Sequence, residues 1–250
     1  MNTANVQNLH PILVIPARMA SSRLPGKPLA DIGGIPMIVH VMERAKAANI
    51  GPVVIACCER EVSDAIRAAG GTAVMTEPDL PSGTDRVLAA VDIIDPNGKH
   101  DCVVNVQGDL PTLDPLSVSA AVGILSEVPH CDISTLAVAT DDVREIADPN
   151  VVKAVLSMET PNCGRALYFT RASAPSGDGP VYHHIGLYAY RRNALNKFCS
   201  LGVSPLEKRE RLEQLRALEA GMRIDVAVVD SAPEGVDTPE DLERARRLIL

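Results

Sequence analysis

A short basic segment, residues 16–28 (PARMASSRLPGKP), follows the first apolar run of the chain. It contains three cations, Arg18, Arg23 and Lys27, and no acidic residue, although the whole chain has a formal net charge of -8. Two serines add hydroxyl donors, and Pro25-Gly26 bends the chain. Flexible cations and free backbone N–H groups of this kind bind phosphate. The segment therefore predicts a polyphosphate site, the alternative being a solvated charged loop.

The place of this segment in the chain supports the same interpretation. Residues 12–15 (ILVI) form a short continuous apolar run, which is typical of a buried parallel strand. In open α/β sheets, ligands bind beyond the carboxyl ends of the strands, which is where the basic segment would lie. The segment contains neither the GxxxxGK[ST] motif nor the GxGxxG motif, so a P-loop or dinucleotide-binding site has little support.

Two aspartates occupy positions from which a carboxylate can hold a metal ion. Asp109 ends the sequence Gln107-Gly108-Asp109 after the apolar run 101–106, and Asp237 precedes the expected start of the last helix. Mg²⁺ takes one or two carboxylates in nucleotide sites, with phosphates and water as its other ligands. We expect Asp109 and Asp237 to bind Mg²⁺, although each alone can equally be a turn residue.

A second group of polar residues lies between positions 171 and 188. Arg171 ends a strand-like run, His183 and His184 begin the next one, and Tyr188 lies four residues after His184. An even spacing places His184 and Tyr188 on the same face of a strand. Arginine, histidine and tyrosine together can bind a carboxylated, hydroxyl-rich ligand. The alternative is a structural histidine.

A helix is expected from Ser204 to about residue 220. On this helix Glu207, Glu210 and Gln214 would share one face. The spacing of Ser204 and Glu207 is that of a capping box, which explains Glu207 without a function. Glu210 and Gln214 remain either binding residues or parts of a solvated face.

The order of the elements predicts an α/β fold with a mostly parallel sheet flanked by helices and a smaller mixed-sheet lobe. We expect one domain, residues 1–250, with a core of about 10–130 and 204–250 and a lobe of about 131–203. A turn is expected at Asp31–Gly34. The other expected elements alternate along the core: strands at 12–15, 53–57, 73–76, 101–106 and 224–229, and helices at 37–48, 61–69, 86–94, 114–127 and from 238. The lobe is predicted to contain strands at 133–139, 151–157, 166–170 and 185–190.

Composition argues against several classes of partner. Aromatic residues are scarce (two Phe, four Tyr, no Trp) and the pI is near 5.3, so nucleic-acid or anionic-membrane binding is not expected.

The six cysteines form no CxxC pair, which favours reduced thiols in an intracellular protein. The start of the chain resembles no signal peptide, and no apolar run approaches the length of a membrane span. We expect a cytoplasmic protein.

Seven motifs occur in a fixed order: PARMASSRLPGKPL, PSGTDR, NVQGD, ALYFTRA, HHIGLYAYR, SPLE followed by LEQLR, and GVDTPEDLER. Together they resemble the 3-deoxy-manno-octulosonate cytidylyltransferases, from about Ile12 to the C-terminus. The resemblance implies a Rossmann-like nucleotidyltransferase fold, dependence on Mg²⁺, and a homodimer with its contact in the lobe. The implied reaction joins CTP and 3-deoxy-D-manno-octulosonate (Kdo) to give CMP-Kdo and pyrophosphate, for lipopolysaccharide biosynthesis.

The resemblance also implies roles for individual residues. The catalytic residues would be Arg18, Lys27, Asp109 and Asp237, the last two as ligands of Mg²⁺. The nucleotide would contact Ala17, Arg18, Ser22, Arg23, Lys27, Ser82, Gly83, Thr84, Arg86 and Gln107. Kdo would contact Arg171, His184, Tyr188, Glu210 and Gln214.

The chain departs from the family pattern at a few positions. Cys57 and Cys58 stand where the family often has Thr-Asp, Leu110 stands where it often has Glu, and the stretch 172–182 is short. Two alternative functions therefore stay open at this point. One is a cytidylyltransferase for another acidic sugar, such as an amino-Kdo or a sialic-acid-like substrate, and the other is a non-catalytic nucleotide-sugar sensor.

Overall fold

A computed structural model describes residues 8–21 and 23–250, and these divide into two compact units. The first, called the split unit here, comprises residues 10–119 and 233–250. The second, the central unit, comprises residues 120–232 together with the described residues before His10. Residues 204–232, assigned to the core from the sequence, group with the central unit. The bounds of core and lobe within one domain stay a prediction.

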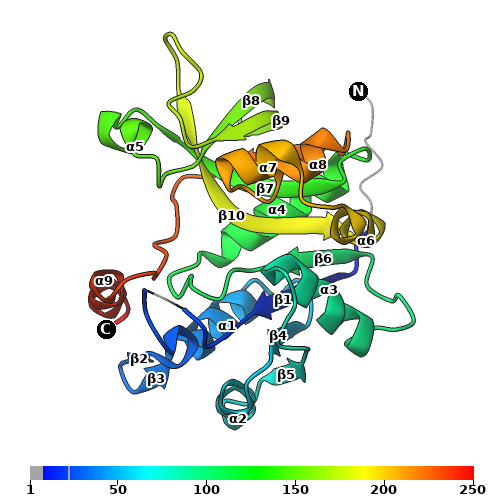
Figure 1. The fold of residues 1–250 in the computed structure, drawn as a ribbon, viewed down its shortest axis with the longest axis vertical. Coiled ribbons are helices and arrows are strands. Elements are labelled where there is room, and N and C mark those ends of the chain that lie inside the picture. Colours follow the sequence, from blue (N-terminus) through cyan, green and yellow to red (C-terminus); the bar gives the residue numbers. More distant parts are fainter. Residues whose placement is uncertain (1–7, 22) are drawn as a thin grey trace. The chain divides into compact units, whose positions relative to one another are not determined.

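The sheet of the split unit consists of parallel strands in the order β5-β4-β1-β6 (Figure 1). Its central strands are buried along nearly their whole length, as the continuous apolar runs predict. The prediction of a parallel sheet with crossover helices is confirmed here. The strands are β1 (Pro11–Pro16), β4 (Val53–Cys57), β5 (Thr72–Met75) and β6 (Cys102–Asn105).

Helices follow the strands of the split unit close to the expected bounds. The first packs against β4, and the third packs against β1, β4 and β5. Ser82 caps the third helix, and Thr238 forms a capping box with Asp241 at the last one. The helices are α1 (Met37–Ala47), α2 (Arg60–Ala68), α3 (Gly83–Ile94) and α9 (Pro239–Ile249), with a short 3₁₀ turn η1 (Lys27–Leu29); α4 (Pro115–Glu127) begins in this unit.

The expected turn at Asp31–Gly34 is the centre of a small hairpin, β2 (Asp31–Ile32) and β3 (Ile35–Pro36). Gly33 and Gly34 both have positive φ, 64° and 83°, which the tight reversal requires. Strand β2 packs against α9, and the buried side chains of Ile32, Val236 and Leu242 share one hydrophobic cluster. The hairpin therefore fixes the start of α9, next to Asp237.

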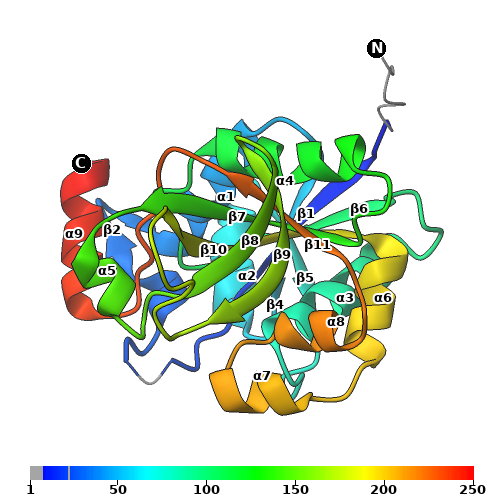
Figure 2. The ribbon, with the colours of Figure 1, turned by 90° about the horizontal axis from the view of Figure 1, so that it is seen from above.

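The central unit contains a mixed sheet in the order β10-β7-β11-β9-β8, and β8 also pairs with β10 (Figure 2). Only the β11–β7 pair is parallel. The predicted strands of the lobe are therefore confirmed, with longer bounds. They are β7 (Ile133–Thr140), β8 (Lys153–Thr160), β9 (Cys163–Thr170) and β10 (Val181–Arg191). The fifth strand of this sheet, β11 (Ile224–Val228), was predicted at 224–229 as a strand of the core.

The expected single helix from Ser204 to residue 220 is wrong. Helix α7 (Pro205–Glu210) ends because Arg211 adopts a left-handed conformation (φ 58°, ψ 45°), and α8 (Leu215–Glu219) starts four residues later. Glu210 and Gln214 therefore do not share a helical face. The capping box of Ser204 and Glu207 is confirmed. Two further helices, α5 (Val143–Ala147) and α6 (Arg192–Ser200), were not predicted from the sequence.

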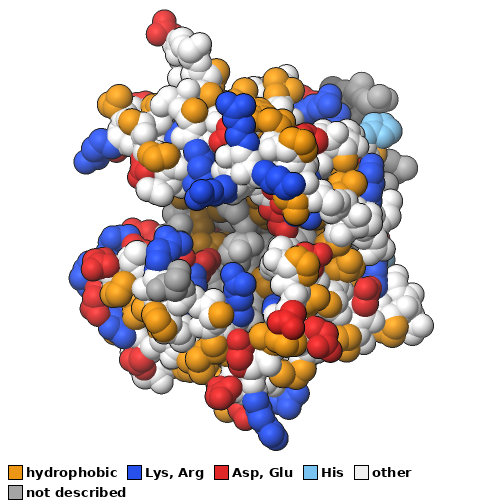
Figure 3. Space-filling view, viewed as in Figure 1, with side chains coloured by type: hydrophobic (Ala, Val, Ile, Leu, Met, Phe, Trp, Pro, Cys, Tyr) orange, Lys and Arg blue, Asp and Glu red, His pale blue; other side chains and the backbone are white. Residues whose placement is uncertain are grey.

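The surface carries both signs of charge. On the face shown in Figure 3, both Lys and Arg side chains and Asp and Glu side chains are spread over the surface. Within residues 8–21 and 23–250, no helix combines the length and the apolar character needed to cross a bilayer.

Candidate active site

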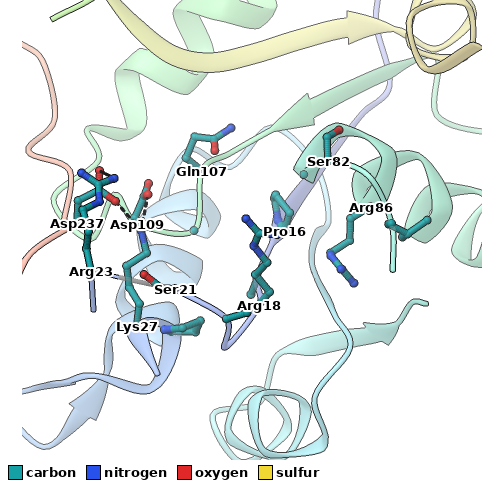
Figure 4. Close-up of a pocket in the computed structure, with 16 residues that line it drawn as sticks. Pro16, Arg18, Ser21, Arg23, Lys27, Ser82, Arg86, Gln107, Asp109 and Asp237 are labelled. Carbon is teal, nitrogen blue, oxygen red and sulfur yellow. Dashed lines mark hydrogen bonds and ion pairs between the residues drawn. The ribbon is translucent and has the colours of Figure 1, made fainter. Parts of the chain in front are cut away.

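A pocket of about 370 Å³ lies at the carboxyl ends of β1 and β6 in the split unit (Figure 4). It has the position expected for a ligand site of an open α/β sheet. The basic segment supplies half of its lining. The lining residues are Pro16, Ala17, Arg18, Ala20, Ser21, Arg23, Lys27 and Pro28 from that segment, Leu80, Ser82, Gly83 and Arg86 at the start of α3, Gln107, Gly108 and Asp109 after β6, and Asp237 before α9.

Cations and carboxylates meet at one end of this pocket. The Nζ atom of Lys27 lies 2.8 Å from Asp109 Oδ2 and 3.0 Å from Asp237 Oδ1. Arg23 Nη2 lies 2.9 Å from the other oxygen of Asp237. Burial alone would lower the pKa of Lys27, but attraction to the two carboxylates outweighs it and raises the pKa above its ordinary value. The lysine is therefore a permanent cation at neutral pH.

The two carboxylates are placed to share a divalent cation. Their oxygens converge on one point, because a single ammonium nitrogen contacts both. Among the residues the structure describes, no group of three or more His, Cys, Asp or Glu side chains could hold a metal ion. Further ligands would have to come from phosphate and water, as Mg²⁺ commonly accepts. The donor set fits Mg²⁺.

The carboxylates are held in place by their neighbours in the chain. The backbone N–H of Val236 donates to the carbonyl of Asp109 (2.9 Å), and that of Asp237 donates to Asp241 Oδ2 (3.0 Å). Gly108 allows β6 to approach β1, since a Cβ there would lie 2.7 Å from the carbonyl oxygen of Pro16. The segments around Asp109 and Asp237 are thus joined directly, although 128 positions separate them in the sequence.

Glu59, which the sequence analysis did not identify, ties the basic segment to the end of β4. Its carboxylate accepts a hydrogen bond from the backbone N–H of Met19 (2.9 Å). The carbonyl of Met19 in turn accepts from Gly26, which has a φ of 72°. Arg18 is exposed and makes no hydrogen bond or ion pair with a described residue, which leaves its guanidinium available to a ligand. The only signal for Glu59 in the sequence was its place directly after a predicted strand.

On the far side of Arg18 from the two carboxylates lie Ser82 and Arg86 (Figure 4). Arg86 is nearly buried, and its guanidinium donates to the Thr76 hydroxyl (2.6 Å) and to the carbonyls of Glu77 (3.1 Å) and Pro78 (3.2 Å). It therefore shapes the pocket wall by holding residues 76–78. Thr84 is buried and does not line the pocket, and Ser22 lies outside the described residues.

The expected sugar-binding residues all lie in the central unit, where Arg171 and Glu210 form one contact. Glu210 accepts hydrogen bonds from the backbone N–H of Arg171 (3.0 Å) and from the Thr170 hydroxyl (2.9 Å). The Nε atom of Arg171 donates to the carbonyl of Glu210 (3.0 Å). Partial burial would raise the pKa of Glu210, but these donors outweigh it and lower the pKa. Glu210 is therefore a carboxylate that fixes Arg171.

His184 and Tyr188 form a second contact. Their ring centroids lie 5.6 Å apart, and the register shift in β10 inserts two residues between them, which preserves their common face. His184 Nε2 lies 3.0 Å from the hydroxyl of Thr135, a residue that the sequence analysis missed. Burial lowers the pKa of His184 to about 3, with a further contribution from His183. His184 is therefore neutral and suited to hydrogen bonding.

Gln214 lies in the segment between α7 and α8. Its side chain is 5 % exposed, and its Nε2 atom has no hydrogen-bond partner among the described residues. Burial raises the pKa of Tyr188, and the neighbouring carboxylate of Glu213 adds to the effect, so this segment lies near β10. A buried donor without a partner costs about 1–3 kcal/mol, which a ligand oxygen would recover.

Comparison with known proteins identifies the family to which this chain belongs. The cytidylyltransferase family model matches residues 12–224. A 3-deoxy-manno-octulosonate cytidylyltransferase of Parvibaculum lavamentivorans is 62% identical over 237 residues, which cover 95% of this chain and 92% of that protein. This chain belongs to the 3-deoxy-manno-octulosonate cytidylyltransferase family. The corresponding protein of Azorhizobium caulinodans is 63% identical over 238 residues, 95% of each chain.

Solved structures agree with this family and with the fold. A CMP:2-keto-3-deoxy-manno-octonic acid synthetase complexed with CTP is 39% identical and superposes with a TM-score of 0.89, covering 96% of this chain and 98% of that one. A nucleotidyl transferase from Methanothermobacter thermautotroptrophicus is 17% identical with a TM-score of 0.63, covering 97% and 98%, and shares the fold alone. The predicted nucleotidyltransferase fold and the resemblance stated from the motifs are confirmed.

Proposed function

We propose that this chain transfers CMP from CTP to Kdo, giving CMP-Kdo and pyrophosphate. The observation that carries the proposal is the cluster of Lys27, Asp109 and Asp237 in the pocket of a 3-deoxy-manno-octulosonate cytidylyltransferase family member. A cation next to two convergent carboxylates suits a triphosphate with its metal ion.

The reaction needs alignment and neutralisation of charge more than covalent help. The hydroxyl oxygen on the anomeric carbon of Kdo attacks the α-phosphorus and loses its proton to solvent. The new O–P bond replaces the α–β phosphoanhydride bond, and pyrophosphate leaves. Arg18 and Lys27, with Arg23 beside them, neutralise the negative charge that develops on the departing phosphates. The buried Cys57 has no role as a nucleophile, because burial raises the pKa of its thiol to about 11.

Asp109 and Asp237 are the proposed ligands of Mg²⁺. When bound, Mg²⁺ would neutralise phosphate charge and orient the triphosphate. Lys27 contacts the same carboxylates in this structure, so its ammonium competes with a metal ion for them. The phosphates of CTP would offer Lys27 an alternative partner.

The sugar side of the reaction is assigned to the central unit. Arg171 is the proposed partner of the Kdo carboxylate, because a guanidinium can bind a carboxylate through two parallel hydrogen bonds. Neutral His184, Tyr188 and the unpaired amide of Gln214 are the proposed partners of the sugar hydroxyls. Glu210 holds Arg171 and completes this group.

We also propose a cytoplasmic homodimer that supplies an activated sugar for lipopolysaccharide biosynthesis. The described cysteines are all free thiols, which is consistent with a reducing compartment. The β8–β9 hairpin carries the exposed apolar side chains of Met158 and Leu167, which support a contact in the central unit. Light scattering after size-exclusion chromatography should give twice the monomer mass, and a monomer mass would remove the dimer from the proposal.

Pyrophosphate release with CTP, Mg²⁺ and a panel of acidic sugars tests the proposed reaction. We expect turnover with Kdo and at least a tenfold lower kcat/KM with amino-Kdo and sialic acid. Turnover of another sugar but not Kdo would change the substrate. Binding of CTP without turnover of any sugar would favour the sensor instead.

A further inference from the structure

Lys153, the first residue of β8, is a buried cation that the proposed reaction does not use. Its side chain is inaccessible to solvent, and no carboxylate of a described residue lies within ion-pair distance of its ammonium. All three of its N–H donors are used by backbone carbonyls, those of Asp148 (2.8 Å), Val151 (2.7 Å) and Arg171 (3.0 Å). Burying an ammonium is costly unless such bonds compensate it, and an apolar side chain would avoid the cost.

The position of Lys153 in the sheet joins β9, which ends next to Arg171, to β10, which carries His184 and Tyr188. Its Cα pairs with Thr170 of β9 on one side and with His183 of β10 on the other. The preceding residue, Val152, accepts a hydrogen bond from the backbone N–H of His184 (2.8 Å). Any shift of this residue would therefore move Arg171 and His184 together.

Arg171 depends on the same segment for the orientation of its side chain. Its Nη1 atom donates to the carbonyl of Pro149 (2.9 Å), within the turn 148–151 that Lys153 binds at both ends. Its backbone is fixed at the N–H by Glu210 and at the carbonyl by Lys153. Lys153 thus holds both the main chain of Arg171 and the turn against which its guanidinium rests.

The guanidinium of Arg171 keeps donors for a ligand. Its partners are two neutral carbonyl oxygens, which engage Nε and Nη1, and its Nη2 atom makes no hydrogen bond to a described residue. Nη1 and Nη2 can each donate a hydrogen bond to a carboxylate, so this edge of the guanidinium can bind it through two bonds. The ammonium of Lys153, which binds the same turn from β8, strengthens the attraction for an anion.

We propose that Lys153 is a positioning residue that fixes Arg171 for the carboxylate of the sugar substrate. The proposal rests on the proposed function, because it needs an acidic sugar bound at Arg171. In this role Lys153 acts through Arg171 and does not contact the substrate itself. Substitution of Lys153 should weaken binding of the sugar and not of the nucleotide, since the nucleotide pocket is lined by residues of the split unit.

A double-mutant cycle tests this role. We expect Lys153→Met to raise KM for Kdo about tenfold and to leave the dissociation constant of CTP within twofold of wild type, which also verifies the fold. In the Arg171→Ala background the same substitution should raise KM less than twofold, because its effect passes through Arg171. Lys153→Arg, which keeps charge and donors, should recover part of the loss. The exposed Lys208→Met is the matched control and should change neither constant.

The outcomes separate this proposal from the proposed function. If wild type turns over Kdo but Lys153→Met only lowers the melting temperature, Lys153 is a structural residue and the proposal is wrong. Equal effects of Lys153→Met in the wild-type and Arg171→Ala backgrounds would also overturn it. If wild type turns over another acidic sugar instead, the proposed function changes, and the same cycle measured with that sugar decides the role of Lys153.

Discussion

The two groups of proposed binding residues are built in opposite ways. In the split unit the charged groups line an open pocket, and Arg18 and Arg23 are exposed. In the central unit the neutral side chains of His184 and Gln214 are buried, and Arg171 is half-buried. Exposed cations can follow a flexible triphosphate, whereas buried neutral groups must be fixed before a sugar arrives. The difference suggests charge neutralisation on one side and selection by shape and hydrogen bonding on the other.

The largest expected effect is the loss of a carboxylate from the nucleotide pocket. Asp109→Asn and Asp237→Asn should each lower kcat by about 10²–10³-fold, because each removes a charged ligand of the proposed metal ion. Pyrophosphate release at saturating CTP and Kdo measures this effect. The exposed Asp64→Asn on α2 is the control. Wild-type activity in either site variant would remove that residue from the metal site.

A somewhat smaller effect is expected for the cation between these carboxylates. Lys27→Ala should lower kcat/KM for CTP by about 100-fold, since it removes charge-assisted hydrogen bonds to phosphate. Both kcat and CTP affinity should fall, because the cation also stabilises the leaving pyrophosphate. Lys46→Ala, at a surface ion pair with Glu43, is the matched control. A loss of affinity with unchanged kcat would reduce Lys27 to simple anion binding.

One substitution in the central unit should weaken binding of the sugar without lowering the stability of the protein. Gln214→Leu should raise KM for Kdo by about tenfold, because the amide loses its bond to the sugar. The melting temperature should stay constant or rise, since a buried donor without a partner has been removed. Kinetics and thermal unfolding on the same samples distinguish these outcomes. A fall in melting temperature with an unchanged KM would show that Gln214 is structural.

A further expected effect concerns stability rather than activity, namely its dependence on pH. His184 has a pKa of about 3 in the folded chain and about 6.5 when unfolded, so the unfolded chain binds more protons between these values. The free energy of unfolding should therefore fall as pH drops below 6.5, by about 2 kcal/mol at pH 5 from this residue. Urea titrations at pH 7 and pH 5 should show a smaller fall in His184→Gln. The exposed His130→Gln should behave as wild type, and an equally large fall in His184→Gln would contradict the assignment.

The same contrast explains what the sequence could predict. The nucleotide pocket comes from short segments at strand ends, so charge and spacing near Lys27 and Asp109 indicated it. The resemblance to the family added Ser82. The hydrophobic periods likewise predicted the parallel strands and their helices to within a few residues. The sequence predicted that Asp109 and Asp237 bind a metal ion. It did not predict that both also contact the ammonium of Lys27.

The central unit could be predicted less well because its groups depend on long-range contacts. The left-handed Arg211 divides the expected helix, and an arginine carries no local signal for that conformation. Thr135 meets His184 across 49 positions, and Lys153 meets Arg171 across 18. Such residues look like ordinary strand positions until the strands are paired.

The separate roles of the two groups, nucleotide binding and sugar binding, are tested most directly with one arginine from each group. KM for CTP and KM for Kdo should be measured for Arg18→Ala and Arg171→Ala under the same conditions. We expect Arg18→Ala to raise only the KM for CTP and Arg171→Ala to raise only the KM for Kdo, each by about 30-fold, as the loss of one charge-assisted contact implies. Equal effects of either substitution on both constants would contradict the account.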